Sequence, residues 1–291
     1  MKRKVDPAVA WAILAAALYA VNSPFSKLLL RKVAPTMMAG LLYLGAGIGM
    51  LLLIMARRLS HAQTNEKRLT RKDLPYTVGM VVLDIAAPIF LMLGLANTTS
   101  ANASLLNNFE IVATSLIALL VFKEAVGRRL WLAIGLITLS SLILSFEDAS
   151  SLEFSVGSLF VLLACVCWGV ENNCTRMMSQ SDPMEIVIIK GFGSGIGSLA
   201  IARVIGEPMP DPAYIPLVLL LGFVAYGLSI FFYVYAQRKL GAAKTSAYYA
   251  VAPFIGVALS LLIFREWPGF SFFAALLIMI AGTYLASTDA A

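Results

Sequence analysis

The stretch Gly45-Ala46-Gly47-Ile48-Gly49 returns 148 residues later as Gly193-Ser194-Gly195-Ile196-Gly197. Two further pairs of short motifs occur in the same order along the chain: Tyr19-Ala20-Val21-Asn22 with Trp168-Gly169-Val170-Glu171, and Phe122-Lys123-Glu124 with Phe264-Arg265-Glu266. Each match is weak alone, but three matches in one order indicate an internal repeat. We therefore expect two halves, residues 1–149 and residues 150–291.

The repeated motifs lie on long apolar runs. Apolar residues make up 60% of the 291 residues and charged residues only 13%, against about 45–50% and about 25% in soluble domains. A helix that crosses a bilayer needs about 20 largely apolar residues. The runs predict ten such helices, at residues 8–29, 37–56, 75–96, 101–122, 130–146, 156–176, 184–202, 214–236, 243–263 and 270–287. The predicted fold is an all-α polytopic membrane protein without a separate soluble domain.

Five spans in each half is an odd number, so the second half must enter the membrane from the opposite side. The basic residues agree: with the N-terminus in the cytoplasm, 16 Lys and Arg lie on the cytoplasmic side and 5 on the other side. This bias predicts that both termini are cytoplasmic, although the cluster from Lys27 to Lys32 is an exception. The basic residues behind the net charge of +6 lie in short loops between apolar runs. We therefore interpret them as a signal of which side of the membrane each loop occupies, and we expect no nucleic-acid partner. Inverted repeats recur in secondary transporters, which favours a carrier.

The chain also resembles EamA-type members of the drug/metabolite transporter superfamily. The resemblance rests on the two Phe-Lys/Arg-Glu endings, on Pro253 twelve residues before the second ending, and on the glycine-rich second and seventh spans. It implies ten helices in two inverted halves, with a central cavity lined mainly by spans 1, 3, 4, 6, 8 and 9. The family often has Glu-Pro in the middle of span 4; here Glu110 keeps the acid and Ile111 replaces the proline. In span 9, Pro253 is present and Ala252 replaces the acid.

Four charged residues lie inside predicted spans: Asp84, Glu110, Glu171 and Lys190. A charge at membrane depth costs about 2.5–3.5 kcal/mol on insertion scales, so such residues usually face a cavity or a partner. Glu110 is the strongest candidate, because the amides of Asn107 and Asn108 precede it on the same span. Burial disfavours the charged form of a carboxylate, which suits proton coupling, and a carboxylate can also hold a cationic or zwitterionic substrate. The alternative is a structural hydrogen bond to a neighbouring helix.

The other three charges have structural and functional interpretations. Asp84 lies one turn before Pro88, which frees the carbonyl four residues earlier, so it belongs either to a local kink, to a helix interface or to the site. Glu171, which matches Asn22 of the first half, either pairs with Lys190 or contacts substrate as a gate. Lys190 alone is more often a structural partner.

Aromatic residues near these charges are candidates for stacking on a substrate. Tyr19 and Trp168 hold matched positions in the two halves and are the preferred pair. At most one of Tyr248 and Tyr249 is expected to line the path, and Tyr248 is the candidate. Tyr226 and Tyr233 are further aromatics on span 8, and the alternative for all of them is the bilayer interface.

Small residues and prolines predict how the spans pack and bend. Gly45, Gly49, Gly193 and Gly197 do not follow a strand, so they do not form a nucleotide-binding loop, and they predict close helix packing. Pro24 and Pro253 are expected to bend spans 1 and 9 and so to assist gating. The three cysteines, Cys165, Cys167 and Cys174, fall on one predicted helix and are expected to be apolar fillers.

These features favour a transporter over an enzyme. The one histidine, His61, lies in a loop, and the chain has no Walker loop, so we expect no metal centre, no cofactor and no ATP-driven pump. We predict a secondary active or facilitative transporter, an exporter of small polar metabolites such as amino acids, that works by alternating access as a monomer or homodimer in a bacterial inner membrane. Protons or another ion are the expected coupling partners. The alternatives are an exporter of lipophilic cationic drugs, a channel and a non-transporting scaffold.

Overall fold

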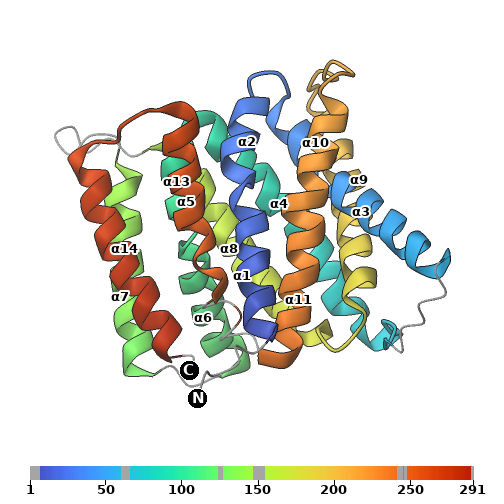
Figure 1. Ribbon diagram of the computed structural model, residues 1–291, viewed down its shortest axis with the longest axis horizontal. Coiled ribbons are helices and arrows are strands. Elements are labelled where there is room, and N and C mark those ends of the chain that lie inside the picture. Colours follow the sequence, from blue (N-terminus) through green and yellow to red (C-terminus); the bar gives the residue numbers. More distant parts are fainter. Residues whose placement is uncertain are drawn as a thin grey trace.

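The computed structural model describes residues 7–59, 66–123, 127–146, 155–240, 245 and 248–289, and all regular elements in these ranges are helical (Figure 1). The helices are α1 (Pro7–Ala20), α2 (Asn22–Leu29), α3 (Pro35–Leu59), η1 (Arg71–Asp73), α4 (Leu74–Asn97), α5 (Ser100–Leu106), α6 (Phe109–Phe122), α7 (Arg128–Ser145), α8 (Val156–Met178), α9 (Pro183–Val204), α10 (Ile215–Gly222), η2 (Phe223–Leu228), α11 (Ser229–Leu240), α13 (Ala252–Phe264) and α14 (Phe270–Asp289).

These elements form the ten predicted spans. Nine stretches of the described residues are long and apolar enough to cross a membrane, and α13 is a shorter apolar helix within the ninth predicted span. Span 1 consists of α1 and α2, span 4 of α5 and α6, and span 8 of α10, η2 and α11. The other spans are α3, α4, α7, α8, α9, α13 and α14, in chain order. The predicted all-α membrane fold is therefore confirmed.

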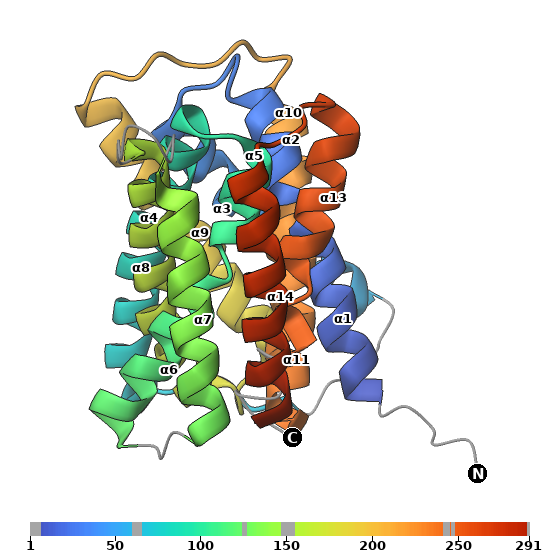
Figure 2. The same ribbon diagram turned by 90° about the vertical axis from the view of Figure 1, so that its left-hand side faces the viewer.

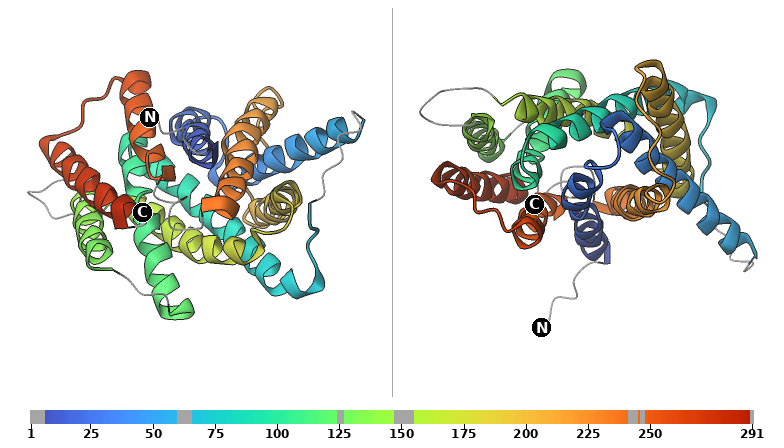
Figure 3. Two further views of the ribbon diagram at one scale, coloured as in Figure 1. Left: turned by 60° about the horizontal axis from the view of Figure 1, so that its bottom comes forward. Right: turned by 90° about the horizontal axis from the view of Figure 1, so that it is seen from above.

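The packing of the spans follows the inverted repeat. Spans 3 and 6 pack together as α4 and α8, and their counterparts, spans 8 and 1, pack together as α11 and α1. In the same way, the contact of α3 with α10 and η2 has its counterpart in the contact of α9 with α4. Three pairs match a span with its own counterpart: α3 with α9, α5 with α13, and α7 with α14. The α7–α14 pair forms one edge of the bundle, and the C-terminal part of α3 extends from the opposite edge (Figure 3).

Both repeated glycine stretches lie at close helix contacts. A Cβ atom on Gly45 would lie 2.1 Å from the carbonyl oxygen of Leu219 in α10, and one on Gly197 would lie 2.3 Å from Cδ1 of Ile85 in α4. These contacts are the two counterpart interfaces, span 2 with span 8 and span 7 with span 3. In lipid, where helix association depends on van der Waals packing, small residues allow this approach.

Three spans are interrupted near their middle. The interruptions at Val21 and Val251 precede Pro24 and Pro253, which cannot donate a backbone hydrogen bond. Span 4 has no proline there, and it tightens instead: the amides of Glu110 and Ile111 donate to carbonyls only three residues earlier, at 3.1 and 3.0 Å.

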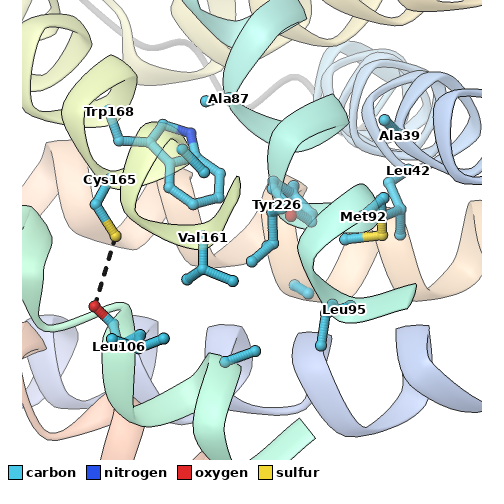
Figure 4. Packing of buried hydrophobic residues seen from close by; sticks show 14 of the residues in the cluster. Ala39, Leu42, Ala87, Met92, Leu95, Leu106, Val161, Cys165, Trp168 and Tyr226 are labelled. Atoms are coloured by element: carbon cyan, nitrogen blue, oxygen red, sulfur yellow. Dashed lines mark hydrogen bonds between the residues drawn. The ribbon is translucent and has the colours of Figure 1, made fainter. Parts of the chain in front are cut away.

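Cys165 of α8 compensates for the interruption of span 4. In a regular α-helix the carbonyl of Leu106 would accept from the amide of Glu110, but that amide donates to Asn107. The thiol of Cys165 donates to the Leu106 carbonyl instead, at 3.6 Å (Figure 4). Figure 4 also shows Val161 and Trp168 on the same helix, within the main apolar core that includes Tyr226 and Met92. All three cysteines are free thiols.

The chain begins α1 and ends α14 at the same end of the bundle (Figure 2), which we call the terminal face; the opposite end is the far face. At the terminal face Arg238 contacts Glu66 at 2.8 Å and donates to the carbonyl of Ser181 at 2.6 Å. At the far face the carboxylate of Glu207 accepts from the amides of Thr36 and Met37, at 3.0 and 2.7 Å. Each face is thus tied by contacts between loops and helices of different halves.

Lys27 also has a structural role at the far face. Its ammonium donates to the carbonyls of Leu95 and Thr98 at the C-terminal end of α4, where the helix dipole favours a cation. This contact gives a physical reason for Lys27, one of the basic residues that depart from the predicted charge bias.

Some sequence features lie outside the described residues. They are Lys2, Arg3, Lys4, His61, Glu124, Lys244 and the boundary between residues 149 and 150. The division into halves at that boundary stays a prediction.

Candidate functional site

A cavity of about 50 Å³ lies among the spans at the centre of the bundle. Side chains from spans 1, 2, 3, 4, 6, 7, 8 and 9 reach it. The lining residues are Tyr19, Tyr43, Asp84, Glu110, Trp168, Glu171, Asn172, Thr175, Lys190, Tyr226, Ile230, Tyr233 and Tyr249. We call it the acidic cavity, because three carboxylates and one ammonium line it.

Lys190 lies between two of the carboxylates. Its Nζ is 2.7 Å from Oε1 of Glu171 and 3.2 Å from Oδ2 of Asp84, and all three side chains are almost completely buried. The hydroxyl of Tyr43 donates to the other oxygen of Asp84 at 2.8 Å, and the hydroxyl of Thr175 donates to Glu171. This network joins spans 2, 3, 6 and 7, so it links the two halves at their centre.

No cation among the residues that the structure describes contacts Glu110. Its Oε1 accepts a hydrogen bond from Nδ2 of Asn172 at 2.5 Å, and no ion pair to it occurs among the described residues. An ionised carboxylate away from water is costly unless a cation or a proton balances it. Glu110 is therefore the group in the acidic cavity that is most able to take up a proton or to face a cationic substrate.

Aromatic rings line the same cavity as the carboxylates and form an aromatic wall. Tyr19 is central: its ring centroid lies 6.3 Å from that of Trp168, 5.8 Å from Tyr226 and 5.7 Å from Tyr249. Tyr226 lies on the π-helical segment η2 and is 2% exposed. Ring faces can attract an ammonium group, so this wall complements the acids.

A second cavity of about 30 Å³ lies between the interrupted spans 4 and 9, and we call it the amide cavity. It shares four residues with the acidic cavity: Tyr19, Glu110, Tyr233 and Tyr249. Its other lining residues are Asn107, Asn108, Ile111, Thr114, Ala250 and Pro253. The two cavities thus form adjoining parts of one site around Glu110.

The residues proposed from the sequence are brought together with few exceptions. Asp84, Glu110, Glu171, Lys190, Tyr19 and Trp168 line the acidic cavity, and Asn107, Asn108 and Pro253 line the amide cavity. Asn22 does not line either of them; it donates to the hydroxyl of Tyr226 at 3.0 Å and so positions that ring. The choice of Tyr248 as a lining residue is corrected: Tyr248 is 40% exposed, and Tyr249 lines both cavities instead.

Sequence reasoning missed Tyr43 and Thr175. Tyr43 lies two residues before Gly45 and faces Asp84 rather than the bilayer interface. Thr175 lies one turn after Glu171, and this spacing of four residues on a helix was the available signal. Among the described residues, no group of three or more His, Cys, Asp or Glu side chains is arranged to hold a metal ion.

The EamA-like transporter family model matches residues 6–146 and again residues 155–288. The chain belongs to the EamA-like transporter family. It is a multi-pass membrane transporter, as the family and the ten apolar spans together indicate. The two matched segments fall within the two halves that the repeated motifs predict.

Curated relatives of this family member carry general names. An uncharacterized transporter of Methanothermobacter thermautotrophicus is 24% identical and aligns over 94% of this chain and 84% of its own length. The uncharacterized transporter YyaM of Bacillus subtilis is 19% identical over 81% of this chain and 79% of its own. A solved crystal structure matches 99% of the chain and 98% of its own, with a TM-score of 0.71 and 16% identity, which supports the fold.

Proposed function

We propose that this EamA-like transporter is a proton-linked secondary transporter that exports small polar metabolites with an amino group, amino acids among them. It lies in a bacterial cytoplasmic membrane, with the terminal face in the cytoplasm. The observation that carries the proposal is the excess of carboxylates over cations in the acidic cavity: buried Asp84 and Glu171 and partly buried Glu110 line it with one ammonium, that of Lys190.

The charge balance suits exchange of a proton for a cation. Lys190 lies 3.2 Å from Asp84 and 2.7 Å from Glu171 and supplies one positive charge to that pair, so two of the three negative charges lack a counter-charge. Glu110, which contacts no cation among the described residues, is the carboxylate that a proton or a cation can balance. A proton and a substrate ammonium compete for such a carboxylate, because either one neutralises a negative charge that is partly removed from water. This competition couples the movement of one to the movement of the other.

The size of the site favours alternating access. A buried water molecule needs a cavity volume of about 10–15 Å³, so cavities of about 50 and 30 Å³ have room for a few water molecules. A metabolite therefore enters only when the spans move apart at one face. Counterpart interfaces between the two halves, such as α3 with α10 and α9 with α4, offer two equivalent surfaces for that movement.

The second candidate is an exporter of lipophilic cationic drugs. The aromatic wall around Tyr19 favours it, since flat cations stack on such rings. A channel would conduct in single-channel recordings, and a scaffold would show no flux of substrate.

The test replaces Glu110 with Gln in proteoliposomes loaded with radiolabelled amino acids and subjected to a pH gradient. We expect Glu110→Gln to reduce gradient-driven flux at least tenfold and to abolish its dependence on pH, because the amide cannot exchange a proton. The matched control is Glu266→Gln, since Glu266 is exposed beyond the end of span 9. Unchanged flux and pH dependence in Glu110→Gln would remove Glu110 from the mechanism.

A further inference from the structure

Asn108 carries a buried side-chain amide that is unpaired within the described part of the chain. It is 1% exposed, and neither its Nδ2 nor its Oδ1 makes a hydrogen bond with any described residue. A buried polar group left unpaired destabilises the fold by its full desolvation cost. Such a group in a cavity wall indicates a ligand that pairs with it in another state of the protein.

The place of Asn108 narrows the kind of ligand. It lies in the wall of the amide cavity, where span 4 and its counterpart, span 9, are both interrupted. Two helices, α6 of 14 residues and α13 of 13 residues, have their N-terminal ends at this point. Helix N-termini carry partial positive charge, and interrupted helices in transporters direct such ends toward anionic groups of substrates.

The opposite requirement comes from Glu110, two residues further along the chain. Glu110 lines both cavities, and its carboxylate repels an anion and attracts an ammonium. A ligand that satisfies the whole wall must therefore present a negative and a positive group close together.

We propose that Asn108 forms the recognition subsite for an α-amino acid zwitterion. Its Nδ2 donates to the carboxylate of the substrate near the N-termini of α6 and α13, its Oδ1 accepts from the ammonium, and Glu110 balances the ammonium. This inference rests on the proposed function, because it specifies the substrate of the same site.

Other ligand classes leave part of this wall unpaired. A simple amine satisfies Glu110 and Oδ1 but leaves Nδ2 without an acceptor. A carboxylic acid without an amine satisfies Nδ2 but places its charge beside Glu110. A lipophilic cation uses the aromatic wall and has no contact for the Asn108 amide. We therefore expect Asn108 to determine how much the carboxylate of the substrate adds to the binding affinity.

The experiment compares amino acids with the amines that lack only the carboxylate. Purified full-length protein is titrated in a thermal-shift assay with L-alanine and ethylamine, L-leucine and 3-methylbutylamine, and L-phenylalanine and 2-phenylethylamine. Ligands that bind the folded state raise the unfolding temperature. For at least one pair we expect the amino acid to bind at least tenfold more tightly than its amine. Asn108→Leu should reduce that preference to less than twofold, because the amino acid loses the contacts of both Nδ2 and Oδ1 and the amine loses only that of Oδ1.

A control and a second variant separate a loss of substrate recognition from a loss of folding. Gln237→Leu removes another buried amide with an unpaired oxygen, 3% exposed and outside both cavities, and it should leave the preference unchanged. Asn108→Asp keeps the size of the side chain, removes the donor and adds negative charge, so it should bind the amine at least as well as the wild type and the amino acid at least tenfold less.

The outcomes separate this inference from the proposed function. Equal binding of amine and amino acid by the wild type, or an unchanged preference in both Asn108 variants, would overturn the subsite. Flux of amines or cationic dyes in proteoliposomes would then still support a transporter. If the protein moves none of these compounds and none raises its unfolding temperature, the proposed function fails together with the subsite.

Discussion

At the scale of single residues, Lys190 shows how a charge can be kept at membrane depth. Its ammonium has two carboxylate partners, Glu171 and Asp84, and the Tyr43 and Thr175 hydroxyls donate to those carboxylates. Each charge is thus paired and hydrogen-bonded. A buried network of this kind is weak evidence for net stabilisation, because desolvation offsets the Coulomb attraction, but removing one member is costly.

We predict that Lys190→Met destabilises the protein by about 3–5 kcal/mol, because it leaves two buried carboxylates without a cation. The triple variant Asp84→Asn, Glu171→Gln, Lys190→Met removes all the charges and should recover most of the loss. Thermal unfolding in detergent measures both. Glu66→Gln at the terminal face, which breaks a more exposed ion pair, should cost less than about 1 kcal/mol. A triple variant as unstable as the single variant would show that the cost lies in packing and not in charge.

The same residues show the limit of sequence reasoning at this scale. The depth of Asp84, Glu110, Glu171 and Lys190 was readable from the apolar runs, and the Glu171–Lys190 contact was one of two alternatives. The choice between Tyr248 and Tyr249 was not readable, because adjacent residues on a helix point about 100° apart and neither span 9 nor its neighbours had a known rotation. The structure places Tyr249 in the cavities and leaves Tyr248 40% exposed.

At the scale of elements, the repeated glycines are contact points between spans of different halves. Gly45 and Gly49 face α10 and η2, and Gly193 and Gly197 face Val81 and Ile85 of α4. Because the two interfaces are counterparts, the glycines recur at the same place in each half. Their pattern was visible in the sequence for this reason.

We predict that Gly45→Ala lowers stability by about 1–3 kcal/mol or more, because the added Cβ would overlap the Leu219 carbonyl oxygen at 2.1 Å. The matched control is Gly135→Ala in α7, where a Cβ would meet no atom within 4 Å. That change should be neutral or stabilise by up to about 1 kcal/mol, since alanine favours a helix interior. Unfolding temperatures of both variants in one detergent give the comparison, and equal effects would argue against the close contact between α3 and α10.

The interruptions of the spans were only partly predictable. Pro24 and Pro253 indicated bends in spans 1 and 9, and interruptions occur just before both prolines. The residues Asn107 and Asn108 did not by themselves predict the tightened turn of span 4. In that turn the Leu106 carbonyl accepts from the thiol of Cys165, 59 positions away in the chain, because the amide of Glu110 donates to Asn107 instead. The π-helical segment that carries Tyr226 was likewise not expected; it packs against α3, a contact that the local sequence does not reveal.

At the scale of the whole molecule, both faces are held by polar contacts between the halves. Arg238 joins Glu66 to the carbonyls of Ser179 and Ser181 at the terminal face, and Glu207 accepts from the first amides of α3 at the far face. Under alternating access these contacts break in turn, so weakening one set should favour opening at that face.

We predict that the accessibility of residue 175, in the acidic cavity, reports at which of the two faces the protein is open. In a background with Cys165→Ser, Cys167→Ser and Cys174→Ser, a Thr175→Cys thiol is labelled with a membrane-impermeant reagent from either side of oriented vesicles. Glu207→Ala should raise labelling several-fold from the far face, and Arg238→Ala should raise it from the terminal face.

The control for this prediction is Asp211→Ala, another acid near Glu207. Its carboxylate accepts a hydrogen bond from the amide of Ala213 in its own loop, so its loss should not change labelling. Equal labelling from both faces in every variant would contradict alternating access.

The amino-acid sequence alone predicts that lipid is the solvent of this protein, where the ten spans lie and that the two halves are inverted. These properties are local or additive: hydropathy, loop charge and motif spacing can be read along the chain without knowing any contact. The folded structure shows which polar groups meet. Lys190 joins Asp84 to Glu171, Tyr249 and not Tyr248 lines the cavities, and Asn108 is buried without a partner among the described residues. Those facts depend on how each helix is rotated about its axis. That rotation is set by packing against other spans, so no single stretch of sequence contains it.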